Sequence, residues 1–217
     1  NRSNILISKD VRNSYKDKVD IEIMKAFKVA ITNITNFHQK QKPNNYEILS
    51  TGVKTSSIWK PLQSVGLYIP GGSAVYPSSL IMNVIPAKVA GVERIVVVTP
   101  SKSEKINPYI LALLDELAIT EVYQVGGAHA IAALAYGTES IKSVNKIFGP
   151  GNAYVASAKK QVFGKVGIDL IAGPSEIVVV ADKNNNPKWV AADLIAQAEH
   201  DEKAQSILIT NDEDFSK

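Results

Sequence analysis

The chain contains no cysteine among its 217 residues. This absence excludes disulfide bonds, a thiolate nucleophile and a zinc site built from cysteines. Long hydrophobic runs are lacking too, since apolar runs such as residues 95–98 and 177–181 are far too short to span a bilayer. No signal-peptide pattern opens the chain. We therefore expect no membrane partner, and a cytoplasmic location agrees with the lack of cysteine.

A strong excess of either charge is also lacking. The chain has 24 Lys and Arg against 21 Asp and Glu, a formal net charge of +3, and its basic residues are spread along the sequence. Nucleic-acid-binding domains carry basic residues clustered on one face, so no nucleic-acid partner is expected. Histidine is scarce, with only His38, His129 and His200. Any site that needs an imidazole has to use one of these three side chains.

Short hydrophobic strands alternate with helical segments over most of the chain. The hydrophobic spacing predicts a long amphipathic helix at residues 19–39 and then two short strands at 46–49 and 53–55. Further strands are expected at residues 65–69, 94–99, 120–125, 146–148, 168–171, 177–181 and 206–210, and helices at 78–90, 107–117, 128–136, 152–163 and 187–200. Pro86 is expected to kink its helix or to end it early. Because such alternation is typical of βαβ units, the expected fold class is α/β with parallel sheets.

Glycine turns border the expected strands at residues 69–72, 125–128, 148–152 and 172–176. Open α/β sheets bind ligands where their strands end, and glycine lets backbone N–H groups approach a phosphate closely. None of the turns has the G-x-G-x-x-G pattern, and no P-loop motif occurs. A packing role and a nucleotide-binding role therefore both stay open.

Individual polar residues in these turns are candidates for ligand contacts. Asn152 is predicted to cap the helix that follows it, and its amide either serves the cap alone or also contacts a ligand. His129 opens a helix after two glycines, where its side chain would point at a bound ligand. Ser175 has no histidine or other base near it in the sequence, so a nucleophilic serine is not supported.

Gln197 and His200 lie three residues apart in the last expected helix, so they share one helix face. Together they resemble half of a metal site. Zinc usually takes four ligands, and glutamine is an unusual one, so these two side chains cannot close a site. Residue chemistry alone favours a helix face without a metal.

Five blocks of the sequence resemble the histidinol dehydrogenase family in their order and approximate spacing. They are VGLYIPGG at 65–72, VGGAHAIAALAYG at 125–137, FGPGN at 148–152, AGPSE at 172–176 and QAEH at 197–200. The resemblance runs from about Ser64 to Thr210 and, more loosely, over the N-terminal part. It implies two similar Rossmann-like α/β domains, one inserted in the other. Residues 1–71 and 175–217 would form the first domain, incomplete at the C-terminal end, and residues 72–174 the inserted one.

The resemblance also implies an activity and a set of contacts. The family oxidises L-histidinol to L-histidine, the last step of histidine biosynthesis, with two NAD and a zinc ion that holds the substrate. It implies that Tyr68, His129 and Asn152 contact NAD. It further implies that Ser175, Gln197 and His200 contact the substrate, with Gln197 and His200 also binding Zn²⁺, in a homodimer when the C-terminal half is present.

Two departures from the family pattern bear on function. His129 stands where the family usually has glutamine, which changes the shape and charge of a group expected to touch NAD. The family's catalytic Glu-His pair and its remaining zinc ligands, an Asp and a second His, come from the C-terminal half, so no catalytic residue is assigned in this sequence. Two hypotheses stay open: the chain is part of a longer, active enzyme, or it is a truncated, inactive homologue that keeps the α/β scaffold and binds a nucleotide weakly.

Overall fold

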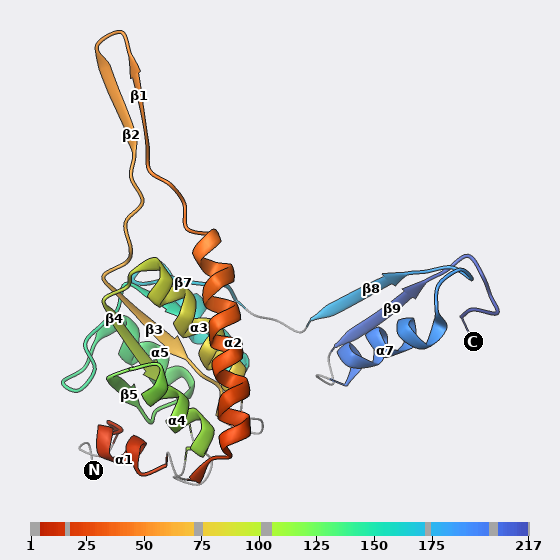
Figure 1. Cartoon of the computed structure of the whole chain (residues 1–217), viewed down its shortest axis with the longest axis horizontal. Helices are drawn as coiled ribbons and strands as arrows, with labels where there is room; N and C mark the ends of the chain where they lie inside the picture. Colours follow the sequence, from red (N-terminus) through yellow and green to blue (C-terminus); the bar gives the residue numbers. More distant parts are fainter. Residues whose placement is uncertain are drawn as a thin grey trace. The chain divides into compact units, whose positions relative to one another are not determined.

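The computed structural model describes residues 5–15, 18–71, 76–100, 106–171, 175–199 and 204–216. The chain divides into two units, Asn1–Ile171 and Ala172–Lys217, and each is considered by itself (Figure 1). Within the described residues, no helix is both long enough and apolar enough to cross a membrane.

The first unit is built on a five-stranded sheet with the order β5-β4-β3-β6-β7. Its strands are β3 (Ser64–Tyr68), β4 (Arg94–Val98), β5 (Glu121–Tyr123), β6 (Lys146–Phe148) and β7 (Gly167–Ile168). Every neighbouring pair is parallel, which confirms the predicted fold class. Within this sheet, the first strand along the sequence is the central β3. The next two, β4 and β5, lie on one side of it, and the chain then crosses over to β6 on the other side. The order of the strands therefore reverses between β3 and β6.

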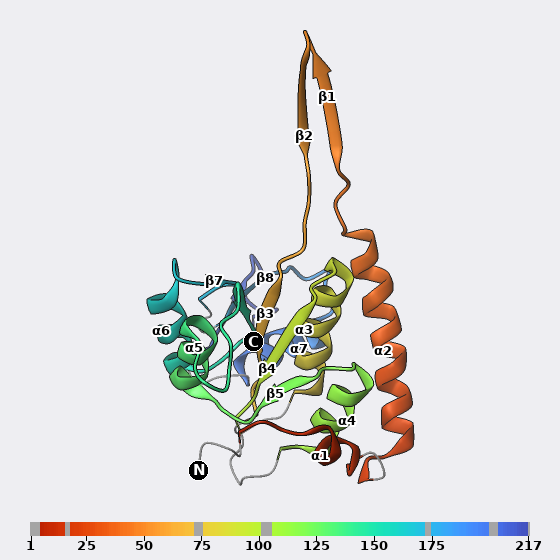
Figure 2. The same ribbon diagram turned by 90° about the vertical axis from the view of Figure 1, so that its left-hand side faces the viewer.

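Helices cover both faces of this sheet (Figure 2). The helices α3 (Pro77–Ala90) and α4 (Pro108–Glu116) pack on one face, and α5 (Gly127–Tyr136) and α6 (Ala153–Val162) on the other. Val65 and Leu67 belong to the α3/α4 core, whereas Val96 and Val98 belong to the α5/α6 core. Because successive strand residues point to opposite faces, hydrophobic runs without polar alternation are what a sheet buried on both faces requires.

The predicted N-terminal helix is α2 (Ile21–Lys40), which begins at Asp20. The Asp20 carboxylate accepts hydrogen bonds from the backbone N–H groups of Glu22 and Ile23 and so caps the first turn. One face of α2 packs against α3 and the core beneath it through Met24, Phe27, Ile31 and Ile34. Before it, the short helix α1 (Lys9–Asn13) follows a segment that pairs with β5, where the Ile7 N–H donates to the Val122 carbonyl at 2.8 Å.

The expectation that Pro86 ends its helix early is wrong. Pro86 lies inside α3, which continues to Ala90 and ends at Gly91 with a left-handed φ of 87°. A proline inside a helix removes its own N–H donor and crowds the carbonyl group four residues earlier. The buried Val84 and Ile85 before it and the partly buried Ala87 and Val89 after it nevertheless pack in the core and hold the helix in place.

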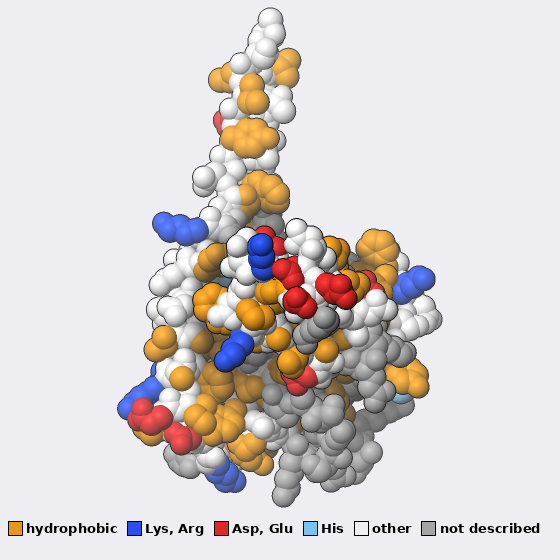
Figure 3. Space-filling view, turned by 90° about the vertical axis from the view of Figure 1, so that its right-hand side faces the viewer, with side chains coloured by type: hydrophobic (Ala, Val, Ile, Leu, Met, Phe, Trp, Pro, Cys, Tyr) orange, Lys and Arg blue, Asp and Glu red, His pale blue; other side chains and the backbone are white. Residues whose placement is uncertain are grey.

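A hairpin joins α2 to the sheet. Two short strands were predicted here, and the structure has both, β1 (Tyr46–Ser50) and β2 (Val53–Ser57), which pair antiparallel. The turn between them consists of Thr51 and Gly52, both with positive φ. Apolar side chains gather along this ribbon and face solvent (Figure 3), with Ile48 58% and Leu49 79% exposed. The hairpin thus contributes little to the core of the unit.

The second unit is a single βαβ element. The strands β8 (Glu176–Val180) and β9 (Gln205–Ile209) are parallel and in register from Glu176 opposite Gln205, and α7 (Pro187–Ala198) connects them. Alternate strand residues are half-buried, such as Ile177 and Val179, and the residues between them are exposed. One face of the strand pair therefore packs with α7.

The expected division into residues 1–71 with 175–217 and an inserted 72–174 stays a prediction as a whole. The boundary at 71/72 does not separate two sheets, because β3 lies before it and is hydrogen-bonded to both β4 and β6, which lie after it. Strand pairing across that point is long-range, and hydrophobic runs along the chain carry no information about it.

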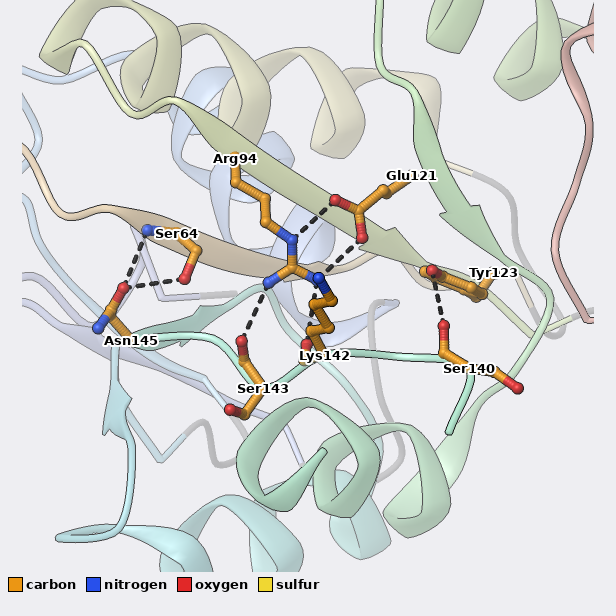
Figure 4. Close-up of polar contacts among 8 residues, drawn as sticks. All are labelled: Ser64, Arg94, Glu121, Tyr123, Ser140, Lys142, Ser143 and Asn145. Atoms are coloured by element: carbon orange, nitrogen blue, oxygen red, sulfur yellow. Dashed lines mark hydrogen bonds and ion pairs between the residues drawn. The ribbon is translucent and has the colours of Figure 1, made fainter. Parts of the chain in front are cut away.

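The amino edge of the five-stranded sheet is tied to the crossover that leads into β6. Arg94 on β4 makes a two-pronged ion pair with Glu121 on β5, at 2.7 and 2.8 Å. The same guanidinium donates to the carbonyl oxygens of Lys142, at 3.1 Å, and Ser143, at 3.0 Å (Figure 4). One planar cation thereby holds the segment before β6 against two strands on the far side of β3.

Tyr123 at the end of β5 is fastened to the same crossover. Its hydroxyl donates to the carbonyl oxygen of Ser140 at 3.0 Å (Figure 4). Burial raises the pKa of the Tyr123 phenol above 10.0, and the nearby Glu121 carboxylate raises it further, while Arg94 acts in the opposite direction. The folded chain therefore keeps the phenolic proton to a higher pH than the unfolded chain does.

Tyr123→Phe tests this coupling. Below pH 10 the variant should be less stable than the wild type by about 1 kcal/mol, because it lacks the bond to Ser140. Since the folded-state pKa is raised, the stabilisation by the phenol is complete below 10.0 and is lost as the pH rises through the folded-state value. The gap in free energy of unfolding between the two proteins, measured with urea, should narrow above pH 10. A gap that widens or stays constant up to about pH 11 would contradict the shift.

Candidate functional site

The carboxyl edge of the five-stranded sheet gathers three of the four predicted glycine turns. Residues 69–71 follow β3, residues 124–127 follow β5, and residues 149–152 follow β6. Gly72 and residues 172–174 lie outside the described residues. In open α/β sheets a crevice for ligands lies outside the carboxyl ends of the strands where the strand order reverses. Here that point lies between β3 and β6.

Tyr68, the last residue of β3, spans this edge. Its side chain is only 4% exposed and packs with the α5/α6 core. The phenol oxygen accepts a hydrogen bond of 3.2 Å from the backbone N–H of Gly127, the first residue of α5. A phenol that accepts one bond still has its own hydrogen to donate. Tyr68 thus links the end of β3 to the start of α5 and keeps a donor at the candidate site.

Gly149 brings the turn after β6 against the end of β3. Its φ is +109°, in the region that favours glycine, and a Cβ at this position would overlap the backbone carbonyl of Tyr68. Only a residue without a side chain allows the two backbones to come this close. The glycine in this turn therefore has a packing role, which was one of the two alternatives for such glycines.

Asn152 begins the next helix, α6, as predicted. Its side-chain oxygen accepts a hydrogen bond of 3.1 Å from the backbone N–H of Val155. Among the described residues, its amide nitrogen donates to no protein group, and the side chain is exposed. The cap is confirmed, and one end of the amide is left for a ligand.

His129 is the third residue of α5 and is exposed at the same end of the helix that Tyr68 contacts. First-turn N–H groups of a helix have no intrahelical acceptor, so the imidazole stands beside backbone donors. The contact of His129 with NAD stays a prediction.

The second unit brings two of the predicted substrate contacts to one end. Ser175 directly precedes β8, and Gln197 lies at the end of α7, which leads back to the start of β9. Because the helix of a βαβ unit runs antiparallel to its strands, both residues lie at the amino edge of the β8–β9 pair. His200, the third, lies outside the described residues.

Gln197 is also unsatisfied. Its Nε2 is buried and has no hydrogen-bond partner among the described residues. Which end of the amide carries the nitrogen is an assignment rather than an observation, so the unsatisfied atom is equally a candidate ligand oxygen. A buried amide without a partner costs free energy in a folded protein, and Gln197 is a position where a ligand would remove that cost.

The described residues do not by themselves fit a zinc ion. They contain no group of three or more His, Asp or Glu side chains that could hold a metal. Gln197 supplies one ligand atom at most, whereas zinc takes four. No chemical step is therefore derived through zinc here.

An ion pair beneath the β6 turn was missed by the sequence analysis. Lys159 on α6 is 3% exposed, and its ammonium lies 2.6 Å from a carboxylate oxygen of Asp169. Lys159 shares the buried face of α6 with Val155 and Val162, at spacings of four and three residues. A lysine on an apolar helix face is the signal that could have drawn attention to it.

A groove at the opposite edge of the sheet is the competing location for a ligand. It is lined by residues at the end of α2, before β3 and at the end of α3, including His38, Trp59, Pro86 and Gly91. None of the five predicted site residues that the structure describes lines it. The carboxyl edge remains the place where the predicted contacts of the first unit converge.

The five-stranded parallel sheet, covered on both faces and reversed in order between β3 and β6, defines a Rossmann-like α/β protein. A family model described as histidinol dehydrogenase matches residues 1–217. The chain belongs to the histidinol dehydrogenase family, and the resemblance of its five sequence blocks is confirmed.

Individual relatives agree with this assignment. Histidinol dehydrogenase of Mesorhizobium japonicum is 56% identical over 215 residues, covering 98% of this chain and 50% of the relative. Histidinol dehydrogenase 1 of Trichormus variabilis is 57% identical over 201 residues, covering 92% and 47%. The crystal structure of histidinol dehydrogenase from Elizabethkingia anophelis superposes with a TM-score of 0.92 at 42% identity, over 99% of this chain and 50% of that one. The chain thus spans about half the length of the relatives it matches.

Replacing Gly149 with alanine tests the close approach to Tyr68. Gly127 is the matched control, because its φ is also positive, at +62°, but a Cβ there meets nothing within 4 Å. Gly127→Ala should lower the free energy of unfolding by about 1 kcal/mol, the cost of a left-handed backbone. Gly149→Ala should lower it by about 3 kcal/mol or more, since overlap with the Tyr68 backbone adds to that cost. Equal losses in urea unfolding would mean that the approach of the two backbones is not tight.

Proposed function

We propose that this chain carries the NAD-binding residues and part of the substrate-binding residues of a histidinol dehydrogenase, which converts L-histidinol to L-histidine. The observation that carries the proposal is the convergence of Tyr68, the start of α5 and the turn after β6 at the point where the strand order reverses. A dinucleotide requires donors from several loops at this point of the sheet. Family membership identifies the reaction to be tested.

In this proposal, three side chains donate hydrogen bonds to the nucleotide. Tyr68 offers its phenolic hydrogen, Asn152 the amide nitrogen that the helix cap leaves unused, and His129 an imidazole N–H. NAD, when bound, supplies the hydride acceptor for the oxidation of an alcohol. The residues of the chain bind and orient it, and the rigid backbone contact at Gly149 sets the distance between the donors on β3 and on the β6 turn.

Ser175, Gln197 and His200 are proposed to contact the substrate, and Gln197 and His200 to provide two zinc ligands. The support is the shared position of Ser175 and Gln197 at the amino edge of β8–β9, and the unsatisfied amide of Gln197. We further propose a cytoplasmic location and, when the C-terminal half is present, a homodimer, as the family resemblance implies. Sedimentation of a protein that includes the C-terminal half as a monomer, or fractionation away from the cytoplasm, would reject those two assignments.

NAD binding by the 217-residue chain is the direct test. Isothermal titration should detect NAD binding, and Asn152→Ala should weaken it about tenfold, equivalent to about 1.4 kcal/mol. Asn186→Ala is the matched control, because Asn186 caps α7 in the same way, with its side chain accepting from the Lys188 N–H at 3.0 Å. Both variants should lose about 1 kcal/mol of stability with their caps, but only Asn152→Ala should lose affinity. A folded chain without NAD affinity would favour the inactive scaffold.

Turnover separates binding from catalysis. L-histidinol and NAD with added zinc should produce no NADH absorbance at 340 nm with the 217-residue chain alone, because the family resemblance assigns the catalytic Glu-His pair to the C-terminal half. NADH formation by a chain of verified mass, 23.5 kDa, would show that a base within these residues does the chemistry. His129 would then be the first residue to replace.

Zinc binding tests the proposed ligands. Competition with a chromophoric chelator should detect weak binding, since two protein ligands leave half of the tetrahedral shell to water. His200→Ala and Gln197→Ala should each reduce that affinity, and His38→Ala should not. Binding that follows His38 instead would move the metal to a different part of the chain.

A further inference from the structure

We propose that the buried Lys159–Asp169 pair positions the turn after β6 for the nucleotide, so that both are positioning residues for NAD. The proposal rests on the NAD site proposed above. It adds two residues that do not touch the nucleotide in that proposal and that the sequence motifs do not include.

The pair holds both backbone groups of one glycine. The Lys159 ammonium donates to the carbonyl oxygen of Gly149 at 2.5 Å, and the Asp169 carboxylate accepts from the N–H of Gly149 at 2.8 Å. The ammonium and the carboxylate meet at 2.6 Å. All of these bonds involve a charged group and are therefore stronger than bonds between neutral groups. The two peptide groups that flank Gly149 are thus fixed in orientation.

The fixed residue is the one that contacts β3. Gly149 has a left-handed φ and lies against the Tyr68 backbone, where no side chain would fit. The proline that follows restricts its own φ, and Asn152 then starts α6, the helix that also carries Lys159. A change at the pair is therefore transmitted to Asn152 by two routes, through the turn and through the helix.

The position of the Lys159–Asp169 pair indicates a role at the proposed NAD site in addition to core packing. A buried ion pair is costly to desolvate, and apolar residues of similar volume often give equal or greater stability. Asp169 follows β7, so its carboxylate lies at the same carboxyl edge of the sheet as the turn it holds. An unpaired carboxylate at this edge would repel the phosphates of a dinucleotide, and the Lys159 ammonium neutralises it.

Three variants distinguish positioning from simple packing. Lys159→Met should weaken NAD binding at least tenfold, whereas Lys159→Arg, which keeps the charge and the donors, should restore most of the affinity. In the double variant Lys159→Met/Asp169→Leu, the unpaired carboxylate is removed, so the midpoint of thermal unfolding should rise above that of Lys159→Met, although the buried N–H and C=O of Gly149 lose their partners. NAD affinity should nevertheless stay at least tenfold reduced, because nothing holds the peptide groups of Gly149. Lys88→Met is the matched control, since Lys88 also donates to a backbone carbonyl, that of Leu117, and it should leave NAD affinity unchanged.

A double variant that regains both stability and NAD affinity would overturn the proposal, because affinity would then only follow folding. The backbone amide resonance of Gly149 gives a readout that does not depend on NAD. It should move upfield in Asp169→Leu and stay in place in Lys88→Met, and an unmoved resonance would also overturn the proposal. If the wild type binds no NAD while this resonance moves as expected in Asp169→Leu, the proposed NAD site is rejected. The hydrogen bonds of the pair to Gly149 would then still be supported, but only as a structural feature of the turn.

Discussion

The contact between the backbones of Gly149 and Tyr68 is the constraint on which the candidate site depends. It lies where the strand order reverses, between β3 and β6, and it requires a residue without a Cβ in a left-handed conformation. Around it, Tyr68 bonds to the start of α5, and Lys159 and Asp169 hold the peptide groups of Gly149. The donors proposed for NAD therefore stand on three elements whose separation is set by one close approach. Flexibility at this point would spread those donors apart.

The polar groups at the two edges of the five-stranded sheet differ in whether they are already bonded within the protein. At the amino edge, Arg94 ties the crossover before β6 to β4 and β5, so that β6 can return to the far side of β3. Tyr123 holds the same crossover from the other end of β5. At the carboxyl edge, polar groups such as the Asn152 amide nitrogen and the exposed His129 remain available. The second unit carries its unsatisfied group, on Gln197, at an amino edge instead.

Local patterns predicted the elements of this fold well, because burial on both faces of a parallel sheet gives unbroken hydrophobic strands, and caps such as Asn107 and Asn152 mark helix starts. The positions of Tyr68 and Asn152 at the carboxyl edge also followed from their turns. The sequence could not reveal that β3 belongs with the strands after residue 72, since strand order depends on long-range pairing. Lys159 and Asp169 were missed for a related reason. Lys159 lies on α6 and Asp169 follows β7, so only the fold brings them together beside Gly149, and neither residue belongs to a motif. The early end expected at Pro86 was wrong because the packing of α3 outweighs one lost hydrogen bond.

The proposed NAD site lies at the carboxyl edge of the sheet, between β3 and β6. The most direct test is to add NAD to the ¹⁵N-labelled chain and follow the backbone amide resonances. Shifts should concentrate at Gly127, Gly149 and Asn152, with smaller changes at the end of β3. Shifts concentrated instead around His38 and Trp59, in the groove at the opposite edge, would contradict this location, as would a spectrum that NAD leaves unchanged.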